Sequence, residues 1–208
     1  MFTRTMRTAW VVMAFLGLIV VAFAVQTILV PAARSEVAMA MFARFPLRAV
    51  LHMVSGMVML VAGALNLDPG LRLRHRVMHR WMGRAYVAAV VVGGSAALLA
   101  APYSYGGMIT HLGFGALGIL SITTTLLGLS AILKGDVRAH KGWMIRSYAL
   151  TLGAVMLRIY LPVSLVAGAR FEEAYQVISW ACWVPNLLVA EFWFVPRATW
   201  HQAARGPL

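Results

Sequence analysis

The stretch from Gly107 to Leu133 reads GMITHLGFGALGILSITTTLLGLSAIL and contains no Asp, Glu, Lys or Arg. At 1.5 Å per residue, a helix of this length exceeds the roughly 30 Å thickness of a bilayer's hydrocarbon core. Similar apolar stretches recur along the chain, and the expected spans cover roughly residues 9–31, 47–67, 79–101, 107–133, 140–167 and 175–196. The sequence therefore predicts an all-α integral membrane protein, a six-helix bundle in which residues 1–208 form a single membrane domain.

The composition excludes a soluble domain, because 62% of the 208 residues are hydrophobic and only six are acidic. The lone cysteine, Cys182, rules out a disulfide within the chain and a thiolate metal cluster. We expect no internal repeat, no glycine-rich phosphate loop and no Ser-His-Asp set, so no catalytic residue is predicted.

The distribution of basic residues predicts the orientation in the membrane. Of the 18 Lys and Arg residues, the predicted outer segments between spans carry only Arg34, Arg44, Arg48 and Arg170, and most others lie at the inner ends of spans. By the positive-inside rule we expect a multi-pass protein of the bacterial cytoplasmic (inner) membrane with both termini cytoplasmic. The net charge of +12 then serves topology and contact with the lipid bilayer, and we expect no nucleic-acid partner.

Four histidines each lie in the first turns of a different, consecutive span: His52, His79, His111 and His140. In an up-and-down bundle, His52 and His111 share the outer face, and His79 and His140 share the inner face. Two imidazoles that face each other across a bundle can bind both axial positions of a haem iron. The pattern predicts two molecules of haem b with these histidines as metal ligands, their irons very roughly 20 Å apart in depth.

Glycine follows three of these histidines by four residues, at Gly56, Gly83 and Gly115. Residues at i and i+4 share a helix face, and glycine there would let a flat macrocycle approach the backbone. The alternative is that small residues only help membrane helices to pack. A single interfacial histidine, likewise, commonly bonds a backbone carbonyl without binding a metal.

Charged residues within the spans are expensive in a membrane and are candidates for function. Arg84, Arg146 and Glu191 are expected at similar depth in the inner half, as an ion-pair cluster in which one arginine can also hold a haem propionate. Arg158 is expected near the outer face, one helical turn before a kink at Pro162. It suits an outer propionate or an acidic electron donor, and alternatively it reaches a carboxylate of the fifth loop.

Three strings carry a family resemblance: His79-Arg-Trp-Met-Gly-Arg-Ala-Tyr86, His140-Lys-Gly-Trp-Met-Ile-Arg-Ser-Tyr-Ala-Leu150 and Leu157-Arg-Ile-Tyr-Leu-Pro162. With His52-x-x-x-Gly56, they resemble a bacterial membrane family known as a domain of unknown function (DUF2306), over roughly residues 45–195. Lys141 departs from the arginine expected after the histidine. The helix and histidine pattern is also similar to cytochrome b561, whose second and fourth, and third and fifth, helices pair their haem ligands.

These observations predict a dihaem, b-type cytochrome-like protein for transmembrane electron transfer, a possible oxidoreductase. A small molecule or quinol would be the electron donor or acceptor, and a homodimer is possible. The alternative is a haem-free small membrane transporter, or a metal-ion or assembly protein, that uses the same histidines. A third possibility is a structural subunit of a respiratory complex.

Overall fold

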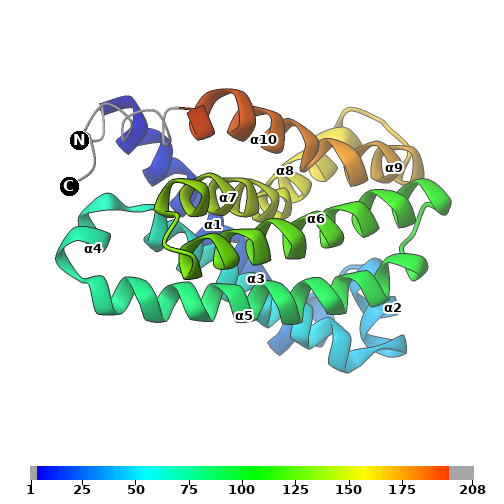
Figure 1. Cartoon of the computed structure of the whole chain (residues 1–208). Coiled ribbons are helices and arrows are strands. Elements are labelled where there is room, and N and C mark those ends of the chain that lie inside the picture. Colours follow the sequence, from blue (N-terminus) through cyan, green and yellow to red (C-terminus); the bar gives the residue numbers. More distant parts are fainter. Residues whose placement is uncertain (1–3, 197–208) are drawn as a thin grey trace. The chain divides into compact units, whose positions relative to one another are not determined.

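The structure is a computed structural model that describes residues 4–196 (Figure 1). The described residues form helices and short connections without any β-strand. Six helical segments are long and apolar enough to cross a membrane: Trp10–Leu29, Pro46–Leu67, Arg76–Tyr103, Met108–Leu133, Val137–Val166 and Phe171–Phe194. The prediction of an all-α membrane protein is confirmed. The two ends of the chain, whose cytoplasmic placement was predicted, lie outside the described residues.

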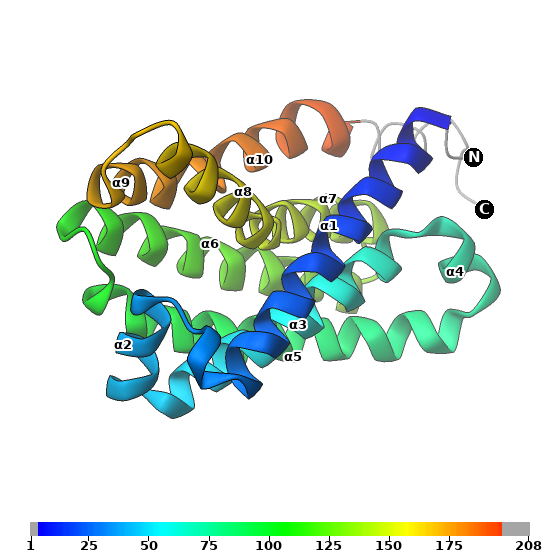
Figure 2. The ribbon, with the colours of Figure 1, turned by 180° about the vertical axis from the view of Figure 1, so that it is seen from behind.

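The chain divides into two compact units, residues 1–100 and 101–208. The helices of unit 1 are α1 (Arg4–Leu29), α2 (Glu36–Arg44), α3 (Pro46–Leu67), α4 (Pro69–Arg74) and α5 (Arg76–Ala100). In this unit α3 packs along α5, and α1 crosses α3, as Figure 2 shows.

A glycine permits the close approach of α3 and α5. A Cβ built at Gly93 would lie 2.5 Å from the Cβ of Ser55, nearer than real side chains come. Helices α3 and α5 can therefore approach each other this closely only because position 93 has no side chain.

Unit 2 begins with a 3-10 turn, Ala101–Tyr103, and contains α6 (Met108–Leu133), α7 (Val137–Thr151), α8 (Gly153–Val166), α9 (Phe171–Ala181) and α10 (Val184–Val189). A π-helical segment, Ala190–Phe194, follows α10. Helix α6 packs against α7 and α9, and α9 packs against α8. The core consists of buried side chains from α7, α9 and the turn after α9: Leu150, Ala174, Ile178, Cys182 and Trp183.

Two short helices, α2 and α4, occupy connections that the hydropathy pattern treats as loops. The Ser35 hydroxyl accepts a hydrogen bond from the Ala38 N–H and caps α2. The Asp68 carboxylate accepts from the N–H groups of Gly70 and Leu71 and caps α4. Ser and Asp at such positions are ordinary signals for the start of a helix. The hydropathy pattern does not reveal these two helices because both are short.

The last two spans are each interrupted once. The fifth changes from α7 to α8 at Leu152, and Pro162 lies farther on, within α8. The sixth changes from α9 to α10 at Cys182 and Trp183, just before Pro185. Proline is well tolerated in the first turn of a helix, where no intrahelical bond is lost, so Pro185 fits the start of α10.

We expect Gly113→Ala to destabilise unit 2 by about 1–3 kcal/mol, because the added Cβ would lie 2.6 Å from the hydroxyl oxygen and 2.9 Å from the carbonyl oxygen of Ser179. Gly115→Ala, on the same helix, should have little effect, since a Cβ there meets no described atom within 4 Å. The single thiol, Cys182, is fully buried, so its labelling by a thiol-reactive fluorophore on heating reports the unfolding. Equal labelling curves for the two variants would contradict the packing.

Candidate functional site

His52 lies near the start of α3 and contacts α5. Its Nδ1 is 3.3 Å from the carbonyl oxygen of Gly93. A carbonyl oxygen can only accept, so Nδ1 carries the proton and Nε2 of the neutral ring carries the lone pair. Histidines that bind metals are commonly oriented in this way, with the other ring nitrogen bonded to a backbone carbonyl.

His140 has the same arrangement in unit 2. Its Nδ1, on α7, lies 2.8 Å from the carbonyl oxygen of Gly128 on α6. A Cβ built at Gly128 would lie 2.8 Å from Sδ of Met144, so this glycine too stands at a close helix contact. His140 therefore also has its proton on Nδ1 and its lone pair on Nε2.

His111, near the start of α6, uses the other ring nitrogen. Its Nε2 lies 3.1 Å from the carbonyl oxygen of Ser104, in the loop before the helix. The ring therefore carries its proton on Nε2. Binding of iron through Nε2 requires the imidazole to leave Ser104.

His79, near the start of α5, contacts the Asn66 side chain at the end of α3. In the amide orientation assigned from its hydrogen-bonding neighbours, Nδ2 donates to Nδ1 of His79 at 3.0 Å and to its carbonyl oxygen at 3.1 Å. Oδ1 accepts from the Gly83 N–H at 3.0 Å. Because Nδ1 accepts, the neutral ring has its proton on Nε2.

Within each unit the two histidines lie at opposite ends of a pair of antiparallel helices. His52 and the Asn66 partner of His79 are 14 residues apart on α3, or about 21 Å along the helix. His111 and the Gly128 partner of His140 are 17 residues apart on α6, or about 26 Å. Each predicted ligand pair takes one histidine from each unit, and the pairing stays a prediction.

The glycines that follow the histidines have room beside them. Among the described residues, a Cβ at Gly56 or Gly115 would meet no atom within 4 Å, and one at Gly83 would meet only Nδ2 of Asn66 at 3.8 Å. By contrast, the glycines at helix contacts, such as Gly93, are crowded. Helix packing among the described residues of each unit therefore does not account for glycine at 56 and 115.

Arg146 forms a two-point ion pair with Glu191 of the π-helical segment. Its Nε and Nη2 donate to the two carboxylate oxygens at 2.6 and 2.8 Å. The guanidinium also lies 4.7 Å from the ring centre of Trp143. The structure thus brings together two members of the predicted ion-pair cluster within unit 2.

The other two arginines singled out from the sequence have different surroundings. Arg84, in unit 1, lies 4.7 Å from the ring centre of Trp81. Arg158 donates from Nη1 to the carbonyl oxygen of Ala154, one turn earlier on α8. At the start of α9, Glu173 pairs with Arg170 at 3.2 Å.

The two units share a sequence pattern, so the expectation of no internal repeat is wrong. Each unit has a helix with His-x-x-x-Gly near its start, followed by a helix with histidine and then Trp-Met-x-Arg-x-Tyr. The second strings run from Trp81 to Tyr86 on α5 and from Trp143 to Tyr148 on α7, and both tyrosines are buried. The residues that bond the second histidine of each unit also correspond. Asn66, which contacts His79, and Gly128, which contacts His140, are 62 positions apart, the same separation as that between Trp81 and Trp143.

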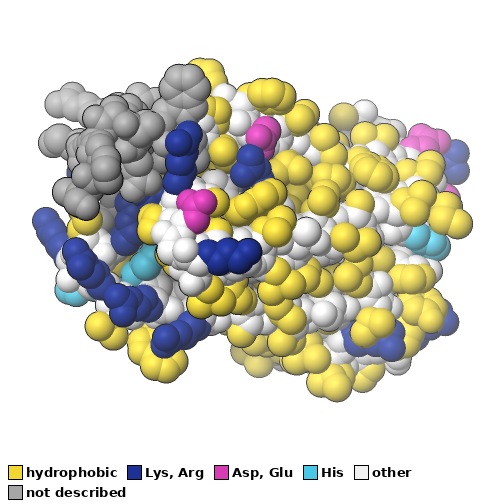
Figure 3. All heavy atoms as spheres, in the orientation of Figure 1, with side chains coloured by type: hydrophobic (Ala, Val, Ile, Leu, Met, Phe, Trp, Pro, Cys, Tyr) yellow, Lys and Arg dark blue, Asp and Glu magenta, His cyan; other side chains and the backbone are white. Residues whose placement is uncertain are grey.

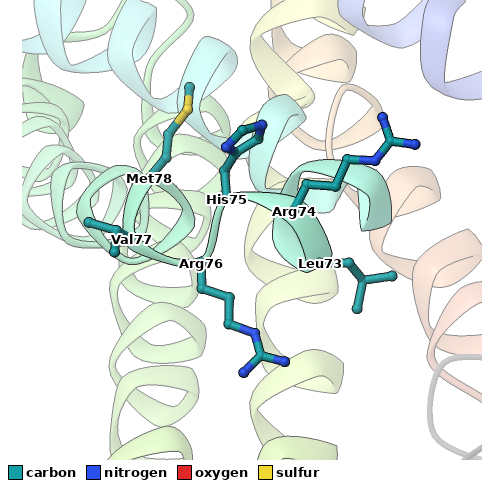
Figure 4. A pocket seen from close by; sticks show the side chains of 6 residues that line it. All are labelled: Leu73, Arg74, His75, Arg76, Val77 and Met78. Atoms are coloured by element: carbon teal, nitrogen blue, oxygen red, sulfur yellow. The ribbon is translucent and has the colours of Figure 1, made fainter.

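The surface around α4 is basic, but its charged side chains do not converge on one point. Lys and Arg side chains gather over α4 and the first turns of α5 (Figure 3). An open pocket of about 580 Å³ is lined by residues 73–78. In Figure 4 the side chains of Arg74 and Arg76 point to opposite sides, so the pocket does not direct them toward one ligand. Among the described residues, no three His, Cys, Asp or Glu side chains are grouped as a metal site.

These features define a multi-pass helical membrane protein with two corresponding helix pairs, each carrying two histidines. The chain belongs to the DUF2306 family, "Predicted membrane protein", whose model matches residues 49–194. No curated protein and no solved structure matches the chain.

We expect Arg146→Met to lower the free energy of unfolding by about 2–3 kcal/mol, because it leaves the Glu191 carboxylate without its partner within a span. The double variant with Glu191→Met should regain part of this loss. Arg170→Met breaks an exposed pair and should change stability by less than about 1 kcal/mol. Thermal labelling of Cys182 measures the stability of all three variants. A loss of stability in Arg146→Met no larger than that in Arg170→Met would contradict a stabilising role for the Arg146–Glu191 pair.

Proposed function

We propose that the protein holds two molecules of haem b and passes electrons across the membrane, as a cytochrome-like transmembrane oxidoreductase. His52 and His111 would bind one haem, and His79 and His140 the other. The observation that carries the proposal is the repeat: corresponding helices of the two units present corresponding histidines. Duplicated helix pairs supply like residues in twos, as bis-histidine ligation requires.

The residues present fit a haem in two respects. His52 and His140 already have the tautomer that iron binding through Nε2 needs. The open space at Gly56 and Gly115 gives a flat ring access to the helix surface. His111 and His79 have their protons on Nε2, so they must exchange partners before they bind.

When bound, haem supplies one-electron redox chemistry, and the chain determines the conditions for it. Haem held by two histidines would serve electron transfer rather than oxygen activation. The carbonyl groups of Gly93 and Gly128 orient His52 and His140 and increase their basicity as ligands.

Arg84 is the arginine best placed to meet a propionate of the haem at His79. It occupies the same position of the repeat as Arg146, whose guanidinium is engaged by Glu191. Arg84 stacks near Trp81 and is exposed. Among the described residues of unit 1, no carboxylate pairs with Arg84, and a cation within a span suits an anionic group of a cofactor.

The remaining parts of the proposal concern location and partners. We propose a bacterial inner-membrane protein with cytoplasmic termini, on the distribution of Lys and Arg. A quinol or another small molecule would exchange electrons at one face, with Arg158 as a candidate contact near the outer one. A homodimer is compatible with this function.

The purified protein should show a Soret band and about two haems per chain by the pyridine haemochrome assay. His52→Ala and His140→Ala should each remove haem, since each deletes an oriented ligand, whereas His75→Ala lies outside the repeated pattern and should not. Wild-type protein without a Soret band would refute the proposal. It would favour the haem-free transporter or the metal-ion or assembly protein.

Arg84→Gln should lower the midpoint potential of one haem by on the order of tens of millivolts, because a nearby positive charge favours the reduced state. Arg80→Gln, one turn earlier on the same helix, is the matched control. A spectroscopic redox titration measures both variants. Equal shifts would show that the effect comes from net charge and not from a propionate contact.

A further inference from the structure

The corner between α4 and α5, which we define as residues 68–81, carries a concentrated positive charge. Its charged residues are one carboxylate and four arginines: Asp68, Arg72, Arg74, Arg76 and Arg80. The Asp68 carboxylate caps α4, and the ion pairs formed by the described residues lie in unit 2. Within the described part of unit 1, no carboxylate therefore pairs with these arginines.

Exposed apolar side chains are interleaved with the arginines of the corner. Leu73, Val77 and Trp81 are all well exposed, and the last two share a face of α5 because they are one turn apart. A soluble polyanion would leave these side chains in water. The boundary of a bilayer instead offers phosphate groups and acyl chains at adjacent depths, and tryptophan is enriched there.

The two spans that flank the corner hold it at such a boundary. They are Pro46–Leu67 and Arg76–Tyr103, and both belong to unit 1. Only residues 68–75 connect them, and six of these residues form α4. The connection is therefore too short to extend far from the membrane, and the distribution of Lys and Arg predicts that this is the inner side.

The arginines of the corner diverge in a way that suits a surface better than a single ion. Arg74 and Arg76 point to opposite sides of the chain (Figure 4), whereas a site for one anion needs donors that converge. Several phosphates spread over a lipid surface can each meet a different guanidinium group. Arg76 also lies in the first turn of α5, where the helix dipole disfavours a positive charge and a nearby phosphate would offset that cost.

We propose that the corner binds the phosphate groups of anionic phospholipids, while Leu73, Val77 and Trp81 enter the acyl-chain boundary of the same leaflet. The arginines select anionic over zwitterionic lipids, because each basic residue near a negatively charged membrane surface adds to the attraction. The proposal does not depend on haem, and a protein without haem would leave it standing.

Electron paramagnetic resonance of spin-labelled lipids tests the selectivity. The full chain is placed in phosphatidylcholine vesicles that contain a trace of spin-labelled phosphatidylglycerol or phosphatidylcholine, and the motionally restricted fraction of each label is measured. The wild type should prefer phosphatidylglycerol. Arg74→Gln with Arg76→Gln should lower this preference by about two- to fivefold at low salt, and added salt should weaken the wild-type preference.

The matched control removes two positive charges from the other end of α3. Arg48 there donates to the carbonyl oxygen of Leu99 at 3.2 Å and lies 4.3 Å from the ring centre of Phe45, and Arg44 lies 5.4 Å from the same ring. Arg44→Gln with Arg48→Gln should therefore change the preference much less. Circular dichroism shows that each double variant is folded. A wild type without preference, or equal falls in the two double variants, overturns the proposal.

Inorganic phosphate separates a lipid headgroup from a soluble anion as the source of the phosphate. At ionic strength matched with chloride, it should leave the restricted fraction of phosphatidylglycerol unchanged. Displacement of the lipid by phosphate under these conditions would show a site for a soluble anion and would overturn the proposal.

A fluorophore at Val77 tests the entry of the apolar side chains. Cys182 is fully buried, so a thiol-reactive environment-sensitive dye labels Val77→Cys at the introduced position. Leu47→Cys is the matched control, since Leu47 and Val77 are both 70% exposed and both lie in unit 1. Transfer from phosphatidylcholine to phosphatidylglycerol bilayers should shift the emission to the blue at Val77→Cys and much less at Leu47→Cys. No shift at Val77→Cys, or equal shifts at both positions, overturns the proposal.

Discussion

Close contact between helices at two glycines determines how the oriented histidines are held. At Gly93 and at Gly128 an added Cβ would collide with the neighbouring helix, and the carbonyl of each glycine receives a histidine Nδ1 from that helix. A larger residue would separate the helices and move the carbonyl away from the ring. Membrane helices have no hydrophobic force between them and rely on such contacts at small residues. The same contact therefore brings the two helices together and fixes the tautomer of the histidine.

The two units repeat this plan and then depart from it at informative positions. Gly128 offers His140 a backbone carbonyl, whereas Asn66, at the corresponding place, offers His79 an amide that can donate or accept. Arg146 pairs with Glu191. Arg84, at the corresponding position of unit 1, contacts the Trp81 ring, and no described carboxylate of that unit pairs with it. Duplicated helix pairs can thus keep one arrangement of histidines while the neighbours of each histidine differ.

Sequence patterns predicted the fold better than they predicted the site. The six spans followed from length and hydropathy, because a bilayer demands both at once. The short helices α2 and α4 do not follow from hydropathy, although Ser35 and Asp68 are ordinary N-cap residues. The repeat was missed because only a few residues recur and their separation changes from 59 positions at the first histidines to 62 at the tryptophans. The tautomers could not be predicted at all, since a carbonyl acceptor such as that of Gly93 is backbone and leaves no mark in the residue type.

Placement of the histidines within each unit constrains how any bis-histidine site could form. His52 and His79 are separated by roughly 20 Å along α3 and α5, and His111 and His140 by a similar length of α6 and α7. Two axial ligands of one iron must lie within a few ångströms of each other's nitrogens, so neither unit can complete a site from its own two histidines. The second ligand must come from the other unit or from another copy of the chain. A single helix pair is therefore not sufficient for the proposed bis-histidine site.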